Sequence, residues 1–221
     1  MTYEITPIKL ALPMRMGNVN CYLIKTANGF ILIDSGASNM RGVLDEKLAA
    51  AGCAAGTLRL IIFTHGDFDH TGNAAHLRKA YGTQLAMHRL DAGMGEHGDM
   101  FENRQAPNFL IRRMVPLFTG FGRAEHFSPD ILLEEGQDLS RFGLDARVLS
   151  IPGHSGGSIG VLTAEGDLFC GDLFENNGKP VLNSIMDDLP SAEASMARLN
   201  TLGIHTVYPG HGDPFAYNVL L

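Results

Sequence analysis

The stretch Thr64–Asn73 reads THGDFDHTGN and directly follows the apolar run Leu58–Phe63, which is expected to form a buried strand. Within six residues it offers four side chains that can bind a cation, namely His65, Asp67, Asp69 and His70. In an extended segment, residues two apart point to the same side, so the first three are expected to face one way. The turn at Gly72 is expected to bring the fourth beside them. This cluster of imidazoles and carboxylates indicates a site for one or two metal ions.

Glycine-rich corners at three other strand ends each present one further histidine or aspartate. PGHSGG at 152–157 follows the run Ala146–Ile151, and PGHGD at 209–213 follows the run His205–Tyr208. The side chains presented there are His154 and His211, and the third is Asp172 in the sequence CGD. Glycine lets the backbone turn tightly and leaves the neighbouring side chain unobstructed. Each residue alone would be read as a hydrogen-bonded structural residue, but together with the first cluster they favour a metal site.

A weak internal repeat connects these residues. Asn20–Gly36 reads as strand, turn and strand closed by Asp34, and Ser158–Asp172 repeats the pattern. Each hairpin is followed by a predicted helix and then by a strand that ends in a histidine loop. Hairpins with glycine turns are common in α/β proteins, which is one interpretation of the similarity. The other is that two related β-rich halves pack face to face and that their strand ends meet at one edge.

Hydrophobic periodicity predicts short strands alternating with helices. The strands are expected at Val19–Ile24, Phe30–Ile33, Leu58–Phe63, Gln84–Met87, Ile131–Leu133, Ala146–Ile151, Ile159–Thr163, Leu168–Cys170 and His205–Tyr208. The helices are expected at Asn39–Ala51, Asn73–Tyr81 and Ser191–Leu202. No linker-like stretch divides the chain, so a single domain over residues 1–221 is expected.

Composition excludes several classes of protein. With 221 residues, 45% hydrophobic and 19% charged, the chain is typical of a packed globular protein rather than a disordered one. No apolar run approaches the roughly 18 residues of a membrane span, and no signal peptide is visible, so a cytoplasmic protein that does not bind membranes is expected. The net charge of −7, without a basic cluster, argues against nucleic-acid binding. Three scattered cysteines exclude a disulfide scaffold or a thiolate zinc knuckle.

The ordered motifs resemble those of the metallo-β-lactamase fold superfamily of metal-dependent hydrolases. They are Asp34, the His65–His70 loop, His154, Asp172 and His211, and the similarity runs from about residue 18 to 215. The resemblance implies an α/β fold, an αββα sandwich of two mixed β-sheets flanked by helices. It also implies a dinuclear centre in which His65, Asp67 and His154 bind one metal and Asp69, His70 and His211 the other, with Asp172 bridging them. Asp34 matches an acid of the family that orients the ligand loops without necessarily touching the metal.

One position departs from the family pattern, because Asp67 stands where the usual loop has its second histidine. A carboxylate is a harder donor than imidazole, so zinc is expected but iron or manganese is also compatible with the site. Asp67, Asp69 and Asp172 supply −3 against +4 from two divalent ions, and one bridging hydroxide would make the centre neutral. Asp67 is therefore expected to lower the electrophilicity of its metal slightly.

The resemblance implies hydrolysis by a bridging hydroxide, with Asp69 as the catalytic residue that orients the nucleophile and moves its proton. Neither a GxSxG nucleophile elbow nor a phosphate-binding P-loop occurs in the sequence. An ester, thioester or lactone of small size is the expected substrate. Two alternatives stay open. One is a diiron redox protein that reduces oxygen or nitric oxide, and the other is a noncatalytic metal-binding protein.

The segment 91–130 is expected to be a helical insertion at the edge of the site. It carries several apolar side chains with arginines, namely Met94, Met100, Phe101, Phe109, Met114, Phe118, Phe121, Arg104, Arg112 and Arg113. It is interpreted either as a substrate lid suited to an acyl group bearing an anion, or as a helical pair that packs on the sandwich or forms a homodimer contact. The five remaining histidines are expected to have no metal-binding role; they are His76, His88, His97, His126 and His205.

Overall fold

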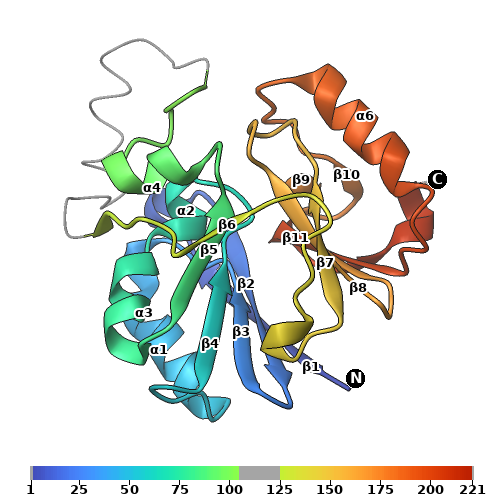
Figure 1. The fold of residues 1–221 in the computed structure, drawn as a ribbon. Helices are drawn as coiled ribbons and strands as arrows, with labels where there is room; N and C mark the ends of the chain where they lie inside the picture. Colours follow the sequence, from blue (N-terminus) through green and yellow to red (C-terminus); the bar gives the residue numbers. More distant parts are fainter. Residues whose placement is uncertain (1, 105–124, 221) are drawn as a thin grey trace.

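The structure, a computed structural model, describes residues 2–104 and 125–220. Two β-sheets pack face to face, and helices cover their outer faces (Figure 1). The first sheet has the order β1-β2-β3-β4-β5-β6, with strands β1 (Glu4–Ala11), β2 (Asn18–Thr26), β3 (Gly29–Ile33), β4 (Leu58–Ile62), β5 (Gln84–His88) and β6 (Ile131–Leu133). The second has the order β12-β11-β9-β8-β7, with β10 paired to β9. Its strands are β7 (Ala146–Ser150), β8 (Ile159–Thr163), β9 (Asp167–Asn176), β10 (Pro180–Leu182), β11 (Thr206–Gly212) and β12 (Phe215–Ala216).

Three apolar layers hold the sandwich together, because strands of both sheets are buried on both faces. In β3, Ile31 and Ile33 point into the layer between the sheets, whereas Phe30 and Leu32 pack towards the outer helices. The helices on the first sheet are α1 (Arg41–Ala50) and α3 (Ala74–Tyr81), and α6 (Leu189–Leu199) covers the second. The expected αββα sandwich of two mixed sheets is therefore confirmed.

The internal repeat in the sequence has a counterpart in the topology of the sheets. In the first sheet β2 and β3 are antiparallel and β3 and β4 parallel, and in the second β8 and β9 are antiparallel and β9 and β11 parallel. Helix α1 connects β3 to β4, and α6 lies between β9 and β11 along the chain. Parallel neighbours end at the same edge of a sheet, so the loops after these strands meet at one end of the sandwich.

Three strands were not expected from the sequence, and several others run further than expected, above all β9 and β11. Strand β1 contains Pro7, which weakens a strand signal, but β1 is an edge strand and an edge tolerates a missing backbone N–H donor. Strands β10 and β12 are only three and two residues long, too short to show a period. Asp172 was expected to close a strand but lies inside β9, and His211 was expected in a loop but lies inside β11.

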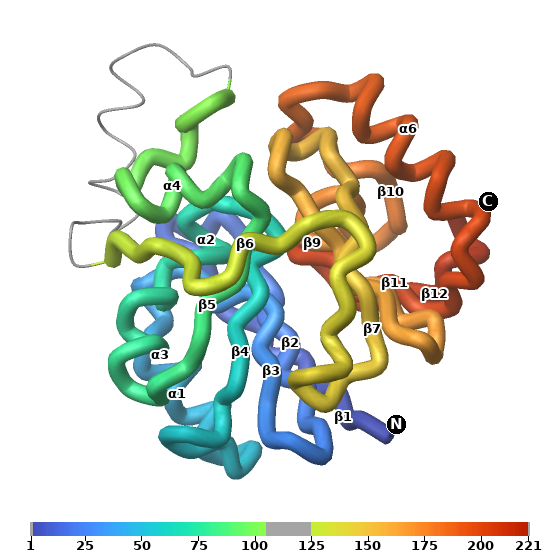
Figure 2. The backbone as a smooth tube through the Cα atoms, in the orientation of Figure 1, coloured from blue at the N-terminus to red at the C-terminus, as the bar shows by residue number. Residues whose placement is uncertain are grey.

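The segment before the second sheet contains α4 (Ala92–His97) and then turns. Residues 105–124 lie outside the described part of the chain, and with them lie Phe109, Arg112, Arg113, Met114, Phe118 and Phe121 of the expected insertion. Figure 2 shows the chain crossing from β6 in the first sheet to β7 in the second. Short 3-10 turns occupy Pro13–Arg15, Ser38–Met40, Ser140–Phe142 and Tyr217–Leu220. In the described ranges, no helix has the length and apolar character that crossing a membrane requires.

Candidate metal centre

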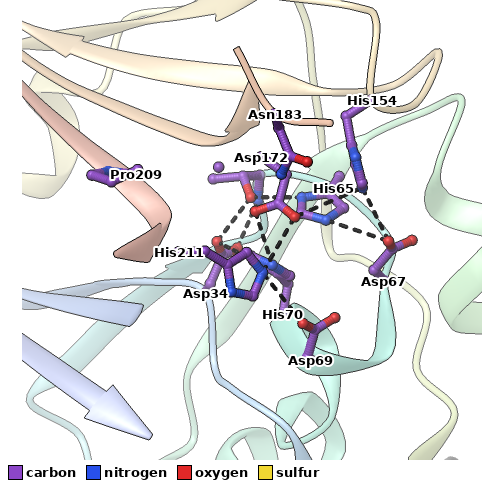
Figure 3. A network of polar contacts seen from close by, with 12 residues as sticks. Asp34, His65, Asp67, Asp69, His70, His154, Asp172, Asn183, Pro209 and His211 are labelled. Carbon is purple, nitrogen blue, oxygen red and sulfur yellow. Dashed lines mark hydrogen bonds and ion pairs between the residues drawn. The ribbon is translucent and has the colours of Figure 1, made fainter. Parts of the chain in front are cut away.

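The residues expected to bind metal meet at one end of the sandwich (Figure 3). His65, His154 and Asp172 form one group of possible ligands, and Asp69, His70 and His211 form a second; in each group the ligand atoms lie within 4.8 Å of one another. Asp67 joins the first group through its Oδ2, which is 3.0 Å from Nε2 of His154 and 3.8 Å from Nε2 of His65. The fold thus brings together all seven residues, which come from the loops after β4 and β7 and from within β9 and β11.

All four histidines are held through Nδ1, which leaves Nε2 for the centre. His70 Nδ1 lies 2.8 Å from Asp34 Oδ2, and His65 Nδ1 lies 3.0 Å from Thr64 Oγ1. The other two donate to backbone carbonyls, His154 to Ile185 at 2.7 Å and His211 to Asn18 at 2.7 Å. Oxygen partners at Nδ1 keep a proton on that nitrogen, so Nε2 carries the lone pair whenever the ring is neutral, which is the form that binds metals.

Unpartnered polar atoms show that this donor set fits a metal. Within the described part of the chain, Nε2 of His65, Nε2 of His70 and Oδ1 of Asp172 are buried and lack a well-formed hydrogen bond, the last two facing each other at 3.3 Å as an ion pair. Buried polar groups without a partner are costly, so such a set at one point indicates an ion that satisfies them. Gly210 leaves room beside them, since a Cβ at this position would lie 2.2 Å from Asp172 Oδ1 and 2.7 Å from His70 Cε1.

Asp34 lies behind the centre and connects two of the ligand loops. It has φ +57°, a left-handed conformation that is rare outside glycine. Its carboxylate accepts hydrogen bonds from the backbone N–H of Thr64 and from Thr64 Oγ1, both at 2.8 Å, as well as from His70 Nδ1. Asp34 therefore contacts His70 at Nδ1, on the side of the ring away from Nε2.

The first ligand loop differs from the expected extended conformation. A single helical turn, α2 (Phe68–Thr71), begins directly after Asp67, so the two-residue alternation stops there. The backbone carbonyl of Asp67 accepts from the N–H groups of His70 and Thr71. This turn directs Asp69 towards His211, with 3.5 Å between Asp69 Oδ2 and His211 Nε2. Helical geometry, rather than strand alternation, therefore separates the two groups of ligands.

Burial and close opposite charges shift the pKa values of these residues strongly. Burial lowers the pKa of the His65 imidazole, and the neighbouring imidazoles of His70 and His154 lower it further. Burial alone would also lower the pKa of His154 and His211, but nearby carboxylates, mainly Asp67 for the first and Asp172 for the second, raise each to about 9. Burial raises the pKa of the Asp69 carboxyl. Without cations, the cluster thus holds protons where metal ions would otherwise sit.

Asp91 is a buried residue that sequence analysis did not single out. Its Oδ2 accepts from the Gly66 N–H at 3.1 Å and from Ser155 Oγ at 2.7 Å, and its Oδ1 accepts from the Gly157 N–H at 2.9 Å. Burial raises the pKa of this carboxyl, and the Ser155 hydrogen bond opposes the shift. Asp91 therefore joins the loop of His65 to the loop of His154. Since the sequence around it carries no ligand motif, only its buried contacts identify it.

Arg104, which belongs to the segment expected to be either a substrate lid or a helical pair, contacts the centre. Its guanidinium forms an ion pair with Asp67, and further hydrogen bonds reach Asp187 and the backbone carbonyl of His154. Burial alone would raise the pKa of Asp67, but the hydrogen bond and charge of His154, followed by the charges of His65 and Arg104, hold it well below its usual range. Met94, from the same segment, is buried beside Gly66 of the ligand loop.

An αββα sandwich with clustered histidines and aspartates at one edge defines a metal-binding class of α/β proteins. A family model described as the metallo-beta-lactamase superfamily matches residues 14–211, and the chain belongs to this family.

Curated relatives of known or assigned activity match most of the chain. The acyl-coenzyme A thioesterase MBLAC2 of Gallus gallus is 31% identical, over 89% of this chain and 73% of the relative. The probable metallo-hydrolase YqjP of Bacillus subtilis is 27% identical, over 96% and 73% respectively. The atrochrysone carboxyl ACP thioesterase of Aspergillus fumigatus is 26% identical, over 90% and 52%. The chain thus spans between about half and three quarters of the length of these relatives.

Solved structures with the same fold are also similar. TTHA1623 in a di-iron-bound form matches with a TM-score of 0.74 and 28% identity, over 97% of this chain and 96% of that one. The B3 metallo-beta-lactamase BLEG-1 matches with the same TM-score of 0.74 but only 20% identity, over 97% and 95%, and this similarity supports the fold alone.

Proposed function

We propose that this protein is a metal-dependent hydrolase that cleaves an ester, thioester or lactone bond. The observation that carries the proposal is the set of buried, unpartnered Nε2 and carboxylate atoms at the edge of the sandwich. Membership of the metallo-beta-lactamase superfamily supports metal-dependent hydrolysis. Two relatives are named as thioesterases, which favours an acyl group on a thiol over other substrates.

Two divalent cations would be held by the seven clustered residues. We assign one ion to His65, Asp67 and His154 and the other to Asp69, His70 and His211, with Asp172 shared between them. Zinc suits the imidazole-rich set, whereas three carboxylates and the di-iron form of one relative keep iron or manganese as candidates. Bound divalent cations lower the pKa of water towards neutrality and polarise the scissile carbonyl.

The residues of the chain position the reactants and move the proton. Asp69 is the proposed proton carrier: its carboxylate orients the attacking water, accepts the proton that this water loses, and delivers it to the leaving thiolate or alkoxide. The carbon–sulfur or carbon–oxygen bond then breaks while the new carbon–oxygen bond remains. Asp34 keeps His70 in place, and Asp91 keeps the loops of His65 and His154 together.

Metal analysis of the purified protein, coupled to hydrolysis of a thioester, a lactone, a β-lactam and a phosphodiester, tests this function. We expect at least one metal ion per chain and turnover of the thioester or lactone. Asp69→Asn is expected to abolish hydrolysis, whereas Asp45→Asn, which alters a carboxylate paired with His76 away from the centre, should keep it. Protein that binds no metal, or full activity of Asp69→Asn, contradicts the mechanism.

The same experiment separates the two alternatives. Iron-loaded protein that reduces oxygen or nitric oxide with an added electron donor would instead indicate a diiron redox protein. Full metal occupancy with negligible hydrolysis of every substrate would indicate a noncatalytic metal-binding protein.

A further inference from the structure

Arg104 lies against the metal centre and is almost fully buried, with only 6% of its side chain exposed. Three of its donors are used by three different segments of the chain. Nη1 donates to Asp67 Oδ1, Nε donates to Asp187 Oδ2 at 2.6 Å, and Nη2 donates to the backbone carbonyl of His154 at 2.9 Å. A long side chain loses much conformational freedom when it is held in this way, so three charge-assisted contacts indicate a specific role.

These contacts close a ring around one side of the centre. Arg104 binds Oδ1 of Asp67, and Oδ2 of the same carboxylate lies 3.0 Å from Nε2 of His154. Arg104 also binds the backbone carbonyl of His154. The planar guanidinium therefore fixes the plane of the Asp67 carboxylate and turns only Oδ2 towards the two imidazoles, whereas a flexible point charge would not.

The charge of the centre is also changed by this contact. Three carboxylates face it, Asp67, Asp69 and Asp172, with a summed charge of −3. Among the described residues, Arg104 is the one arginine or lysine that forms an ion pair with any of the three. Counting Arg104, the three carboxylates and the guanidinium sum to −3 + 1 = −2; Asp187, which binds Nε of the same guanidinium, is an exposed residue whose charge is screened by solvent and is left out of this sum. The formal charge of the centre with two divalent ions and one hydroxide, which was expected to be zero from the sequence, is therefore +1 when Arg104 is counted.

We propose that Arg104 is a positioning residue that holds Asp67 and cancels its charge, so that the two cation sites differ in affinity. The guanidinium is in direct contact with Asp67 on the side of His65 and His154. The group of Asp69, His70 and His211 has no direct ion pair with it among the described residues. A fixed positive charge repels a cation more strongly at the nearer position, and this repulsion is poorly screened in a buried site. The Asp67 side is therefore the weaker site and fills second.

Cation titration of metal-stripped protein, followed by calorimetry with Zn²⁺ and repeated with Mn²⁺, tests this inference without any activity readout. The wild type should bind in two resolved steps. Arg104→Met should raise the affinity of the second step by about tenfold or more and leave the first within about threefold. Arg104→Lys keeps the charge but loses the planar contact, so its second step should stay closer to the wild type than that of Arg104→Met. Asp67→Asn, which removes the carboxylate that Arg104 holds at the centre and leaves Asp187 as its one charged partner among the described residues, should weaken the second step by about tenfold or more.

Arg78→Met is the matched control, because Arg78 also binds one carboxylate and one backbone carbonyl, those of Asp130 and Ser128, but outside the centre. It should leave both steps unchanged. Unchanged affinities in Arg104→Met, or equal losses in Arg104→Met and Arg104→Lys, would overturn the proposal. If Arg104→Met does not fold, the Asp67→Asn variant provides the test. The proposal is also overturned if this variant binds the second cation with the affinity of the wild type.

This inference rests on the proposed metal centre, and the experiment keeps the two apart. A wild type that binds neither cation refutes the centre itself. Two-step binding that is insensitive to Arg104 refutes only its role.

Discussion

Replacing Asp91 with asparagine should loosen the metal centre, although Asp91 is not among the expected ligands. The carboxylate accepts three hydrogen bonds, two of them from backbone N–H groups next to the ligand-bearing corners. Asparagine keeps one acceptor oxygen, which can face Gly66 and Ser155. Its amide N–H₂ then faces the Gly157 N–H, a donor opposite a donor.

The magnitude follows from these contacts. One buried donor left without a partner costs about 1–3 kcal/mol, and the two remaining hydrogen bonds lose the extra strength that a charged acceptor gives. Part of this loss is offset because the neutral amide of asparagine costs less to bury than the carboxylate of Asp91, whose charged form burial opposes. We expect a net loss of about 3 kcal/mol, which lowers the midpoint of thermal unfolding by roughly 6–12 °C in a chain of this size.

Urea and thermal unfolding of metal-stripped Asp91→Asn, with metal content measured on the reloaded protein, provides the assay. Asp188→Asn is the control: Asp188 also accepts two hydrogen bonds, from the N–H and the hydroxyl of Ser191, but it is an exposed helix cap where asparagine serves equally well. The reloaded Asp91 variant should hold less metal than the control. If the two variants unfold at the same urea concentration, Asp91 does not join the ligand loops in the way described.

Four further predictions concern the centre as a whole. Gly210→Ala should prevent metal loading, because its Cβ would lie 2.2 Å from Asp172 Oδ1; normal metal content in a folded variant would contradict the crowding argument. Chelation should lower the unfolding temperature of the loaded protein by several degrees, since the ions stabilise a cluster of like charges, and scanning calorimetry with and without chelator measures it. Metal-stripped protein should be more stable at pH 6.5 than at pH 9.5. His154 and His211 have folded-state pKa values of about 9, above the unfolded value, so the protons that stabilise the folded state are lost as the pH rises through 9. Urea unfolding at the two pH values measures this, and equal midpoints would argue against the shifts. Asp67→His should raise the ratio of zinc to iron in protein as purified, and an unchanged ratio would show that donor hardness does not select the metal.

Most of the centre could be predicted because its chemistry is local in the sequence. Four of the seven clustered residues lie within the segment His65–His70. Each of the other three is next to glycine in the sequence, a pattern that predicts a turn near the end of a strand. The αββα layers could be predicted for a similar reason, since strands buried on both faces appear as continuous apolar runs such as Phe30–Ile33.

What escaped prediction depends on partners distant in sequence or on short elements. Strand β1 is formed by pairing along the whole of β2, which overrides the weak local signal of a segment containing proline. The helical turn at Phe68–Thr71 is only four residues long, too short for any period to reveal, yet it decides which group of ligands Asp69 joins.

The sequence by itself thus determined the class of fold and the identity of the clustered donors, because buried strands and glycine-rich turns are both recognised from residues that are adjacent in the sequence. Only the tertiary structure decided which hydrogen bonds hold the loops that carry the donors and which charge lies against their carboxylates. Asp91 lies 64 residues from Ser155, and Arg104 lies 37 residues from Asp67, with no periodicity to connect them. Hydrogen bonds and charges act over a few ångströms in space, so their partners become visible only when the chain is folded.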